Sequence, residues 1–143
     1  MSYTFTNSVP YLINRAGAAV GSRFTHRIAD RGITLPMYRS LAVLRQTGTK
    51  TLGELSVMVS KDQSTLSRII GQLEELGLVT RVRPKENARI VLIDLTPEGA
   101  ALADELMPIA IHFEDTLTQG LEAAEVTELK RLLRHVYANI DAL

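Results

Sequence analysis

The chain has 143 residues, which suits one domain, or one domain extended by helices that bind a second copy. It contains no cysteine, which excludes disulfide scaffolds, thiolate zinc sites, iron–sulfur clusters, thiol redox sensing and cysteine nucleophiles. Apolar residues make up 45% of the chain, yet no apolar run approaches the ~18–20 residues that span a bilayer. The N-terminal segment also lacks the basic residues of a signal peptide. We therefore expect a folded cytoplasmic protein with no membrane partner.

The formal net charge is zero, but the charges are distributed unevenly along the chain. Residues 1–49 contain six Arg and one Asp, and residues 50–96 contain seven basic and six acidic residues. Residues 97–143 contain three basic and nine acidic residues. This asymmetry indicates a basic face and an acidic tail, as in proteins that bind nucleic acid. A solvated helix that is acidic by chance explains the same balance equally well.

The first part of the chain predicts two helices. Apolar residues recur in steps of three and four over residues 8–31, which is typical of one face of a long helix. Gly32 ends this helix, and Pro36 is the expected first residue of a second helix that extends to about Gln46. The segment 47–50, TGTK, predicts a turn.

Two shorter helices with separate N-terminal caps follow. Each is preceded by Ser or Thr with Glu or Gln three positions later, a pattern typical of a capping box. The first cap, Thr51, starts a helix over residues 52–59. The second cap, Ser60, starts a helix over residues 61–76, which Gly77 ends. Its apolar residues form a single stripe: Leu66, Ile69, Ile70, Leu73 and Leu76.

Beyond these helices the apolar period changes from 3.6 to 2 residues. Residues 78–83 alternate between apolar and polar side chains, and residues 91–95 do so in part, which predicts two short strands. The polar segment PKENAR lies between them and begins with Pro84. The sequence therefore predicts a β-hairpin with a basic tip.

The last part of the chain is helical again. The sequence Thr96–Pro97–Glu98 supplies an N-cap, a proline at the first helical position and an acidic residue in the first turn. Two helices follow, over about 97–118 and 122–141, and Gly120 lies between them. Pro108 is expected to kink or break the first of the two.

This order of elements predicts a mainly α protein with a small β-hairpin wing (α+β). A winged helix-turn-helix lobe over residues 34–96 is flanked by helical regions 8–31 and 97–143 within a single unit, 1–143. The flanking helices are too apolar to stand alone, and they pack most simply against each other across the twofold axis of a dimer. Packing within one chain alone is the other possibility.

The outer face of the predicted helix 61–76 has side chains suited to reading DNA. A rigid helix with short polar side chains and a guanidinium group reaches base edges in the major groove, where Gln63 suits adenine and Arg68 suits guanine or a phosphate. The amides after Ser60 favour a phosphate. A solvated helix face explains any one of these residues equally well. The candidate DNA contacts on this helix are Lys61, Gln63, Ser64, Thr65, Ser67 and Arg68.

The predicted hairpin supplies a second group of candidate DNA contacts. Arg83, Lys85 and Arg89 surround the turn, and Arg81 lies just before it. A basic hairpin suits insertion into a narrow minor groove. Asn87 belongs to the same group for one of two reasons. Its side chain forms a hydrogen bond to Arg89 that sets the turn, or the residue tolerates a left-handed backbone conformation.

Three segments, taken together, resemble a known family. They are TLGELSVMVSKDQSTLSRIIGQLEELGLVTRV, PKENAR and VLIDLTPEG, and with the helical ends they resemble the MarR family of bacterial transcription regulators over nearly the whole chain. The resemblance implies a winged-helix homodimer that binds a pseudo-palindromic operator, usually as a repressor. It also implies that a small phenolic or aromatic carboxylate ligand, bound between the dimerisation helices and the DNA-binding lobe, releases the DNA.

The resemblance transfers to individual positions. Asp62 to Arg68 match the recognition-helix motif of the family, and Arg89 matches its wing arginine. The family usually has Asp two residues before that arginine, where this chain has Asn87, so an ion pair becomes at most a neutral hydrogen bond. Without cysteine, the oxidant-sensing branch of the family does not apply.

Arg15 and Tyr38 are the candidate effector-binding residues. They lie where similar proteins line the ligand crevice, and a guanidinium with a phenol could hold an aromatic carboxylate. A surface arginine and a core tyrosine are the simpler explanation. We expect no metal site, because adjacent helical positions such as His112, Glu114 and Asp115 do not converge on one ion.

The sequence thus predicts a sequence-specific transcription regulator that binds double-stranded DNA, a second copy of itself and a small aromatic effector, without a cofactor. An alternative is a winged-helix protein–protein adaptor, which would have an acidic or apolar outer face on helix 61–76. An enzyme is disfavoured, because the sequence has no Gly-rich phosphate loop, paired catalytic carboxylates or triad order, and so no catalytic residue is named.

Overall fold

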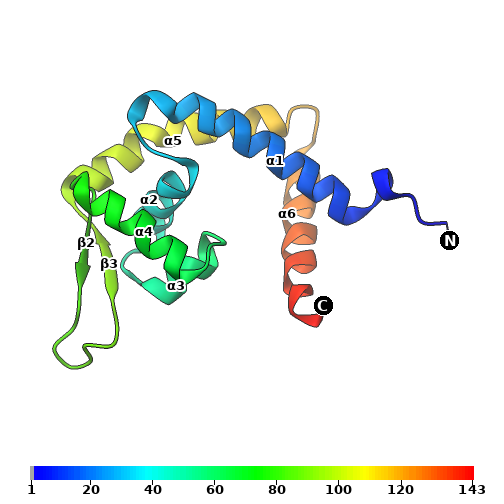
Figure 1. The fold of residues 1–143 in the computed structure, drawn as a ribbon. Helices are drawn as coiled ribbons and strands as arrows, with labels where there is room; N and C mark the ends of the chain where they lie inside the picture. The colour runs from blue at the N-terminus through cyan, green and yellow to red at the C-terminus, as the bar shows by residue number, and fades with distance from the viewer. Residues whose placement is uncertain (1) are drawn as a thin grey trace. The chain divides into compact units, whose positions relative to one another are not determined.

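The computed structural model describes residues 2–143 (Figure 1) and consists of two compact units, one up to Leu106 and one from Met107 to Leu143. In chain order, the helices and strands (η marks a 3-10 helix) are η1 (Phe5–Asn7), α1 (Val9–Ile28), η2 (Ala29–Arg31), α2 (Leu35–Thr47), β1 (Lys50–Thr51), α3 (Leu52–Met58), α4 (Gln63–Glu75), β2 (Val79–Val82), β3 (Leu92–Leu95), α5 (Pro97–Leu117), α6 (Ala123–Ala138) and η3 (Ile140–Ala142). The predicted mainly α fold with a β-hairpin wing is confirmed. No helix within residues 2–143 is long and apolar enough to cross a membrane.

Local signals account for most helix boundaries in the first unit. The hydroxyl of Ser8 accepts a hydrogen bond from the Tyr11 amide at the start of α1, and Thr34 caps α2 in the same way. The predicted helix 8–31 is confirmed, although its last turn is 3-10. Gly32 ends this turn with φ 71°, a left-handed conformation that glycine adopts without strain.

The sheet has three antiparallel strands in the order β1-β3-β2. The two predicted strands are confirmed, and their register pairs Val79 with Leu95 and Val82 with Leu92. In β1, Lys50 pairs with Ile93 of β3. The sequence does not predict β1, because this strand has two residues and overlaps the segment 47–50, which predicts a turn. A strand of two residues is too short to show an alternating pattern.

The core of the first unit lies between α1–α5 and the sheet. Leu66, Ile70 and Leu73 of α4 are fully buried, which confirms the apolar stripe predicted for that helix. Leu76, predicted to belong to the same stripe, is 54% exposed because it is the C-cap residue beyond the last helical turn. The largest fully buried apolar side chains of the unit are Ile28, Leu41, Leu55, Leu66, Ile70, Leu73, Ile93 and Leu106.

The start of α5 packs closely against the end of α4. The hydroxyl of Thr96 donates to the Gly77 carbonyl at 2.7 Å and accepts the Gly99 amide at 3.0 Å, which confirms Thr96 as the N-cap. The Thr96 amide donates to the Leu78 carbonyl at 3.1 Å. A Cβ atom at Gly99 would lie 2.0 Å from that carbonyl oxygen, so this contact requires glycine.

α5 continues through Pro108 to Leu117, so of the two predicted effects of this proline the break is wrong, and the kink stays a prediction. A proline in a helix removes one backbone hydrogen bond, and the turns on either side hold the helix together here. The boundary between the two compact units falls beside it, after Leu106.

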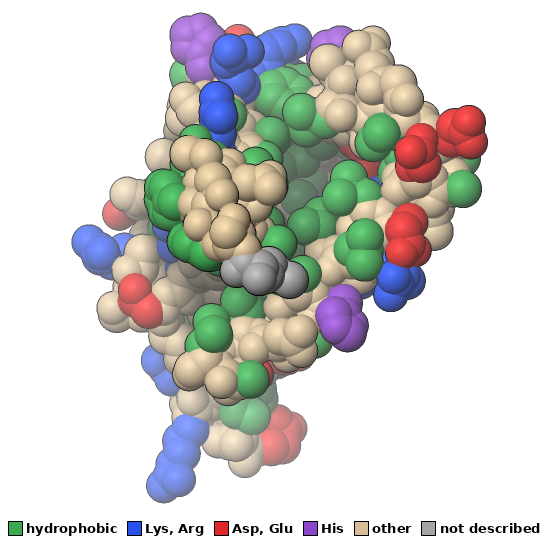
Figure 2. Space-filling view, turned by 90° about the vertical axis from the view of Figure 1, so that its right-hand side faces the viewer, with side chains coloured by type: hydrophobic (Ala, Val, Ile, Leu, Met, Phe, Trp, Pro, Cys, Tyr) green, Lys and Arg blue, Asp and Glu red, His purple; other side chains and the backbone are tan. Residues whose placement is uncertain are grey.

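The second unit contains the end of α5, α6 and η3. Gly120 has φ 85° in the turn before α6, and Lys130 of α6 forms an ion pair with Glu114 of α5 at 2.8 Å. No residue within 107–143 is buried, and large apolar side chains such as Leu117 and Tyr137 are 58% and 62% exposed. Figure 2 shows hydrophobic side chains at the surface of the face that it presents. This unit has no hydrophobic core of its own.

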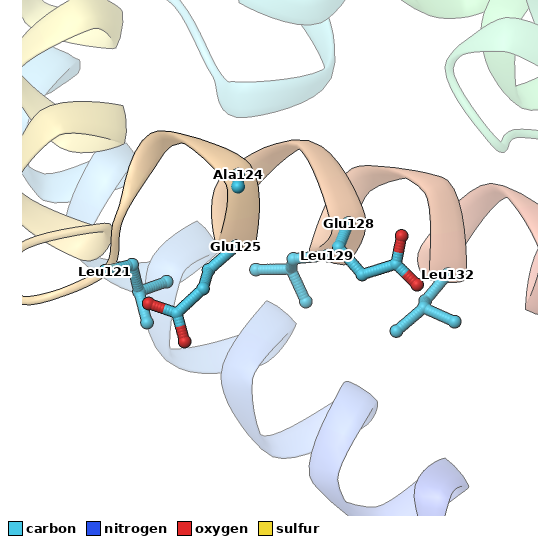
Figure 3. A pocket seen from close by; sticks show the side chains of 6 residues that line it. All are labelled: Leu121, Ala124, Glu125, Glu128, Leu129 and Leu132. Carbon is cyan, nitrogen blue, oxygen red and sulfur yellow. The ribbon is translucent and has the colours of Figure 1, made fainter.

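α6 carries an open groove of about 430 Å³ on its apolar side. Leu129 and Leu132 of α6, and Leu121 in the turn before it, project into this groove (Figure 3), and Glu125 and Glu128 line it as well. The groove is therefore apolar along its length and acidic at its edge.

Candidate nucleic-acid interface

The predicted recognition helix, α4, starts two residues later than the sequence predicts. Ser60 is not its N-cap: it lies in the turn between α3 and α4 with φ 56°, a left-handed conformation. Two hydrogen bonds, from the Ser60 amide to Val57 and from the Lys61 amide to Ser56, hold this turn. Only then does α4 begin, and its N-cap is Asp62.

The Asp62 carboxylate accepts hydrogen bonds from polar groups in the first turn of α4. It accepts the Thr65 amide at 2.8 Å, the Ser64 hydroxyl at 2.8 Å and the Thr65 hydroxyl at 2.9 Å. These hydrogen bonds, led by the Thr65 amide, lower the pKa of Asp62 to about 2, so the carboxylate is ionised at neutral pH. One amide at the start of α4, that of Thr65, is therefore bound by an anion of the protein itself, and phosphate binding at the other amides after Ser60 stays a prediction.

Ser67, another predicted DNA contact, is also engaged within the protein. Its hydroxyl accepts a hydrogen bond from Nη1 of Arg81 at 3.0 Å, and its carbonyl oxygen accepts one from Nη2. The sequence indicated Arg81 only as one more positive charge beside the wing. The bond between strand β2 and helix α4 has no local sequence signal, because the two residues are 14 positions apart.

Three of the DNA contacts predicted for helix 61–76 remain available, one in the turn before α4 and two on α4. Lys61, Gln63 and Arg68 are exposed, and no hydrogen bond or ion pair engages their side chains within the part of the chain that the structure describes. The Gln63 amide nitrogen lies over Gly53 of α3, 3.5 Å from the position that a Cβ would take there. These three polar side chains are therefore free to contact another molecule.

The wing turn is held by two bonds between its own residues. The Asn87 side-chain oxygen accepts the Arg89 amide at 3.1 Å, so the predicted hydrogen bond between these residues is confirmed, with the backbone of Arg89 as the donor. The alternative, a left-handed conformation of Asn87, is wrong; within residues 2–143 only Ser60 and four glycines have positive φ. Arg83 donates to the Ala88 carbonyl at 2.9 Å, so Arg83 closes the turn.

Lys85 and Arg89 are then the exposed cations of the wing whose side chains form neither a hydrogen bond nor an ion pair among the described residues. Glu86 lies beside them in sequence and offsets one charge.

The N-terminal arginines are less free than the charge pattern suggests. Arg45 of α2 binds both oxygens of Asp104 on α5, at 2.8 and 2.9 Å, and Arg31 forms an ion pair with Glu105. The hydrogen bond from Arg45 lowers the pKa of Asp104. Two of the positive charges that the sequence assigns to a basic face thus neutralise acidic residues of α5.

The two candidate effector residues lie apart. Tyr38 is half-buried, its ring centroid lies 4.6 Å from that of Phe24, and burial raises the pKa of its hydroxyl. Arg15 is exposed on α1, nine residues before Phe24. At 100° and 1.5 Å per residue, Arg15 lies on the opposite side of the helix and about 13 Å along its axis. One chain does not bring Arg15 and Tyr38 together. No group of His, Asp and Glu within residues 2–143 is placed to hold a metal ion.

The chain is similar to proteins of a known family, the MarR family. The family model for the MarR family matches residues 33–91. The multiple antibiotic resistance protein MarR of Salmonella typhimurium is 33% identical over 107 residues, which cover 73% of this chain and 73% of that protein.

Two solved structures are similar over nearly the whole chain. BpsR of Bordetella bronchiseptica, whose DNA binding is regulated by 6-hydroxynicotinic acid, has a TM-score of 0.84 and 29% identity, and the match covers 96% of this chain and 98% of that one. NadR in complex with 4-hydroxyphenylacetate has a TM-score of 0.83 and 25% identity, with 95% and 96% covered.

Proposed function

Because the chain belongs to the MarR family of transcription regulators, we propose that it binds operator DNA as a homodimer and represses transcription until a small aromatic ligand releases it. The observation that carries this proposal is the pair of free polar surfaces on one lobe. One consists of Gln63 and Arg68 on α4 with Lys61 in the turn before it, and the other of Lys85 and Arg89 on the wing. The alternative role as a protein–protein adaptor calls for an acidic or apolar α4 face. We assign the activity to the cytoplasm.

In this proposal residues 34–96 form the DNA-binding lobe. α4 enters the major groove, where Gln63 and Arg68 contact base edges, and the wing enters the adjacent minor groove with Arg89. Lys61 and Lys85 contact phosphates. The remaining predicted contacts, Ser64, Thr65, Ser67, Arg83 and Asn87, contribute mainly by fixing the helix and the turn, because their polar groups already bind the protein.

The helical regions 8–31 and 97–143 form the dimer interface in this proposal. Val9, Leu12 and Ile13 of α1 are exposed large apolar residues, and the second unit has an apolar groove on α6. Apolar surface of this extent is typical of an interface rather than of a monomer surface. A twofold dimer then presents two recognition helices to one pseudo-palindromic site.

The proposed effector is a small aromatic acid with a phenol-like hydroxyl. Both ligands named for the similar structures, 6-hydroxynicotinic acid and 4-hydroxyphenylacetate, combine an aromatic ring, a hydroxyl and a carboxylate. Tyr38, beside the Phe24 ring, supplies an aromatic wall and a hydroxyl, and Arg15 supplies a cation for the carboxylate. A site that includes both residues would take Arg15 from the second copy.

The first experiment is selection of bound duplexes from a random pool at near-physiological salt, followed by sequencing. We expect an enriched inverted repeat whose half-site centres lie about one helical turn (~10 bp) apart. Titration of the bound operator with each of the two aromatic acids then tests release. A pool without enrichment, retained only weakly and in a salt-sensitive way, contradicts the proposal and favours the adaptor.

A further inference from the structure

The most extensive polar contact between the wing and the recognition helix is made by one arginine, Arg81 of β2. Its Nε donates to Oε1 of Glu74 at 2.7 Å, its Nη1 donates to the Ser67 hydroxyl at 3.0 Å, and its Nη2 donates to the Ser67 carbonyl. All three nitrogens of the guanidinium are therefore directed to α4. The Arg81 side chain is 28% exposed and the Glu74 side chain is 38% exposed, so the contact is partly shielded from water.

The positions on α4 that receive Arg81 share one face of the helix. Ser67, Gly71 and Glu74 follow one another at spacings of four and three residues. Gly71 has no side chain, and a Cβ there would lie 3.5 Å from Nη2 of Arg81. The guanidinium thus lies along the helix and contacts it over two turns, which fixes α4 against rotation about its own axis relative to β2.

Strand β2, which carries Arg81, continues into the turn at the tip of the wing. Arg81 pairs with the fully buried Ile93 in the β2–β3 ladder, and β2 ends at Val82, one residue before Arg83. A displacement of β2 relative to α4 therefore moves the whole turn. The residues proposed to contact the major groove, on α4, and the minor groove, on the wing, are connected through the Arg81 side chain.

We propose that Arg81 is a positioning residue for DNA reading: it holds the wing at a fixed place relative to α4 and does not itself contact DNA. This inference rests on the proposed function. Two groups that read adjacent grooves bind together with high effective concentration only when their separation matches the DNA. An arginine fork is suited to this role, because a lysine ammonium cannot bind the carboxylate, the hydroxyl and the carbonyl in the same geometry.

The first test needs no DNA. The chain has no cysteine, so Glu75→Cys on α4 and Glu86→Cys on the wing accept a pair of spin labels in an otherwise unlabelled background. Labelled chain is diluted with unlabelled chain so that distances within one chain are recorded. We expect a narrow distance distribution in the parent and a broader one with Arg81→Gln. An unchanged distribution overturns the inference, whatever the protein's affinity for DNA.

The second test measures operator binding across a salt series. Arg81→Gln is expected to lower specific affinity about tenfold, within the range for residues coupled in one network, and to leave the salt slope unchanged. Arg81→Lys is expected to lose nearly as much. Arg89→Gln is the matched control. Replacing a wing arginine that contacts phosphates in the groove is expected to reduce the magnitude of the salt slope by about 1. A slope reduced to the same extent by Arg81→Gln makes Arg81 a DNA contact and overturns the inference.

A double-variant cycle separates positioning from a general loss of structure. If Arg81 acts by placing the wing, its replacement costs less affinity in an Arg89→Gln background than in the parent, since the wing then contributes less. Equal losses in the two backgrounds overturn the inference. A parent chain that shows no sequence-specific binding instead refutes the proposed function, and the spin-label result remains a separate measure of the Arg81 contact.

Discussion

Replacement of Gly99 by alanine tests the close packing between α5 and the end of α4. The new Cβ would lie 2.0 Å from the Leu78 carbonyl oxygen, 3.0 Å from the Leu78 carbonyl carbon and 3.1 Å from Cδ2 of Leu95. Because the first two atoms belong to the backbone, neither moves without displacing the chain. The same Leu78 carbonyl accepts the Thr96 amide, so a displacement weakens that hydrogen bond as well.

The expected loss of stability follows from these contacts. Overpacking costs about 1–3 kcal/mol, and the weakened hydrogen bond costs about 0.5–1.5 kcal/mol. The higher helix propensity of alanine returns at most about 1 kcal/mol. We therefore expect Gly99→Ala to lower the free energy of unfolding by about 0.5–4.5 kcal/mol.

Urea unfolding at one fixed protein concentration measures this loss, because an associating protein unfolds at a concentration-dependent midpoint. Gly71→Ala is the matched control. It lies in α4 of the same lobe, where the new Cβ would lie 3.5 Å from Nη2 at the flexible end of Arg81, an ordinary contact distance. It is expected to stabilise by up to about 1 kcal/mol. If Gly99→Ala unfolds at the same urea concentration as the parent, the packing argument is refuted.

Three further predictions concern the DNA-binding lobe. Ser60→Gly should raise the free energy of unfolding by about 0.5 kcal/mol, the difference between a relieved left-handed conformation and the added freedom of glycine in the unfolded chain; a lower urea midpoint contradicts this. The lowered pKa of Asp62, about 2 against an ordinary 3.8, stabilises the fold above about pH 4, and this contribution disappears as the pH falls toward 2. Asp62→Asn should therefore lose less stability than the parent between pH 5 and pH 2, in urea titrations at each pH, and parallel curves would rule out this role. Arg68→Ala should cost about 1–3 kcal/mol on the operator and relax specificity at one base pair, whereas Lys85→Ala should weaken all sequences and reduce the salt slope by about 1. Equal losses on operator and random DNA from both variants would refute this division of roles.

Most of the fold could be predicted from the sequence because its signals are local. The caps at Thr51 and Thr96 act over three residues, and the stripe of Leu66, Ile70 and Leu73 repeats within one helix. Such local signals do not depend on how the rest of the chain packs. The error at Ser60 has the same origin: two overlapping cap patterns, at Ser60 and at Asp62, compete within three residues, and the turn after α3 decides between them.

The site could be predicted only as a set of residue types. The sequence placed Ser67 and Arg81 near DNA, but their mutual hydrogen bond spans 14 positions and depends on the packing of β2 against α4. The pair of Arg45 with Asp104 spans 59 positions and depends on the tertiary fold in the same way. Polarity and spacing identify which side chains are suited to DNA, whereas their partners within the protein decide which of them are free to bind it.

The neutral bond at Asn87 affects how the wing responds to ionic strength. An Asp–Arg pair at this turn would be screened as salt rises, and it would neutralise part of the arginine charge before DNA is met. In this chain the turn is tied by an amide oxygen to a backbone N–H, so its geometry is independent of counterions, and the Arg89 guanidinium keeps its whole charge. Salt should therefore weaken DNA binding by this wing through counterion release alone, with no additional loss from an unravelling turn.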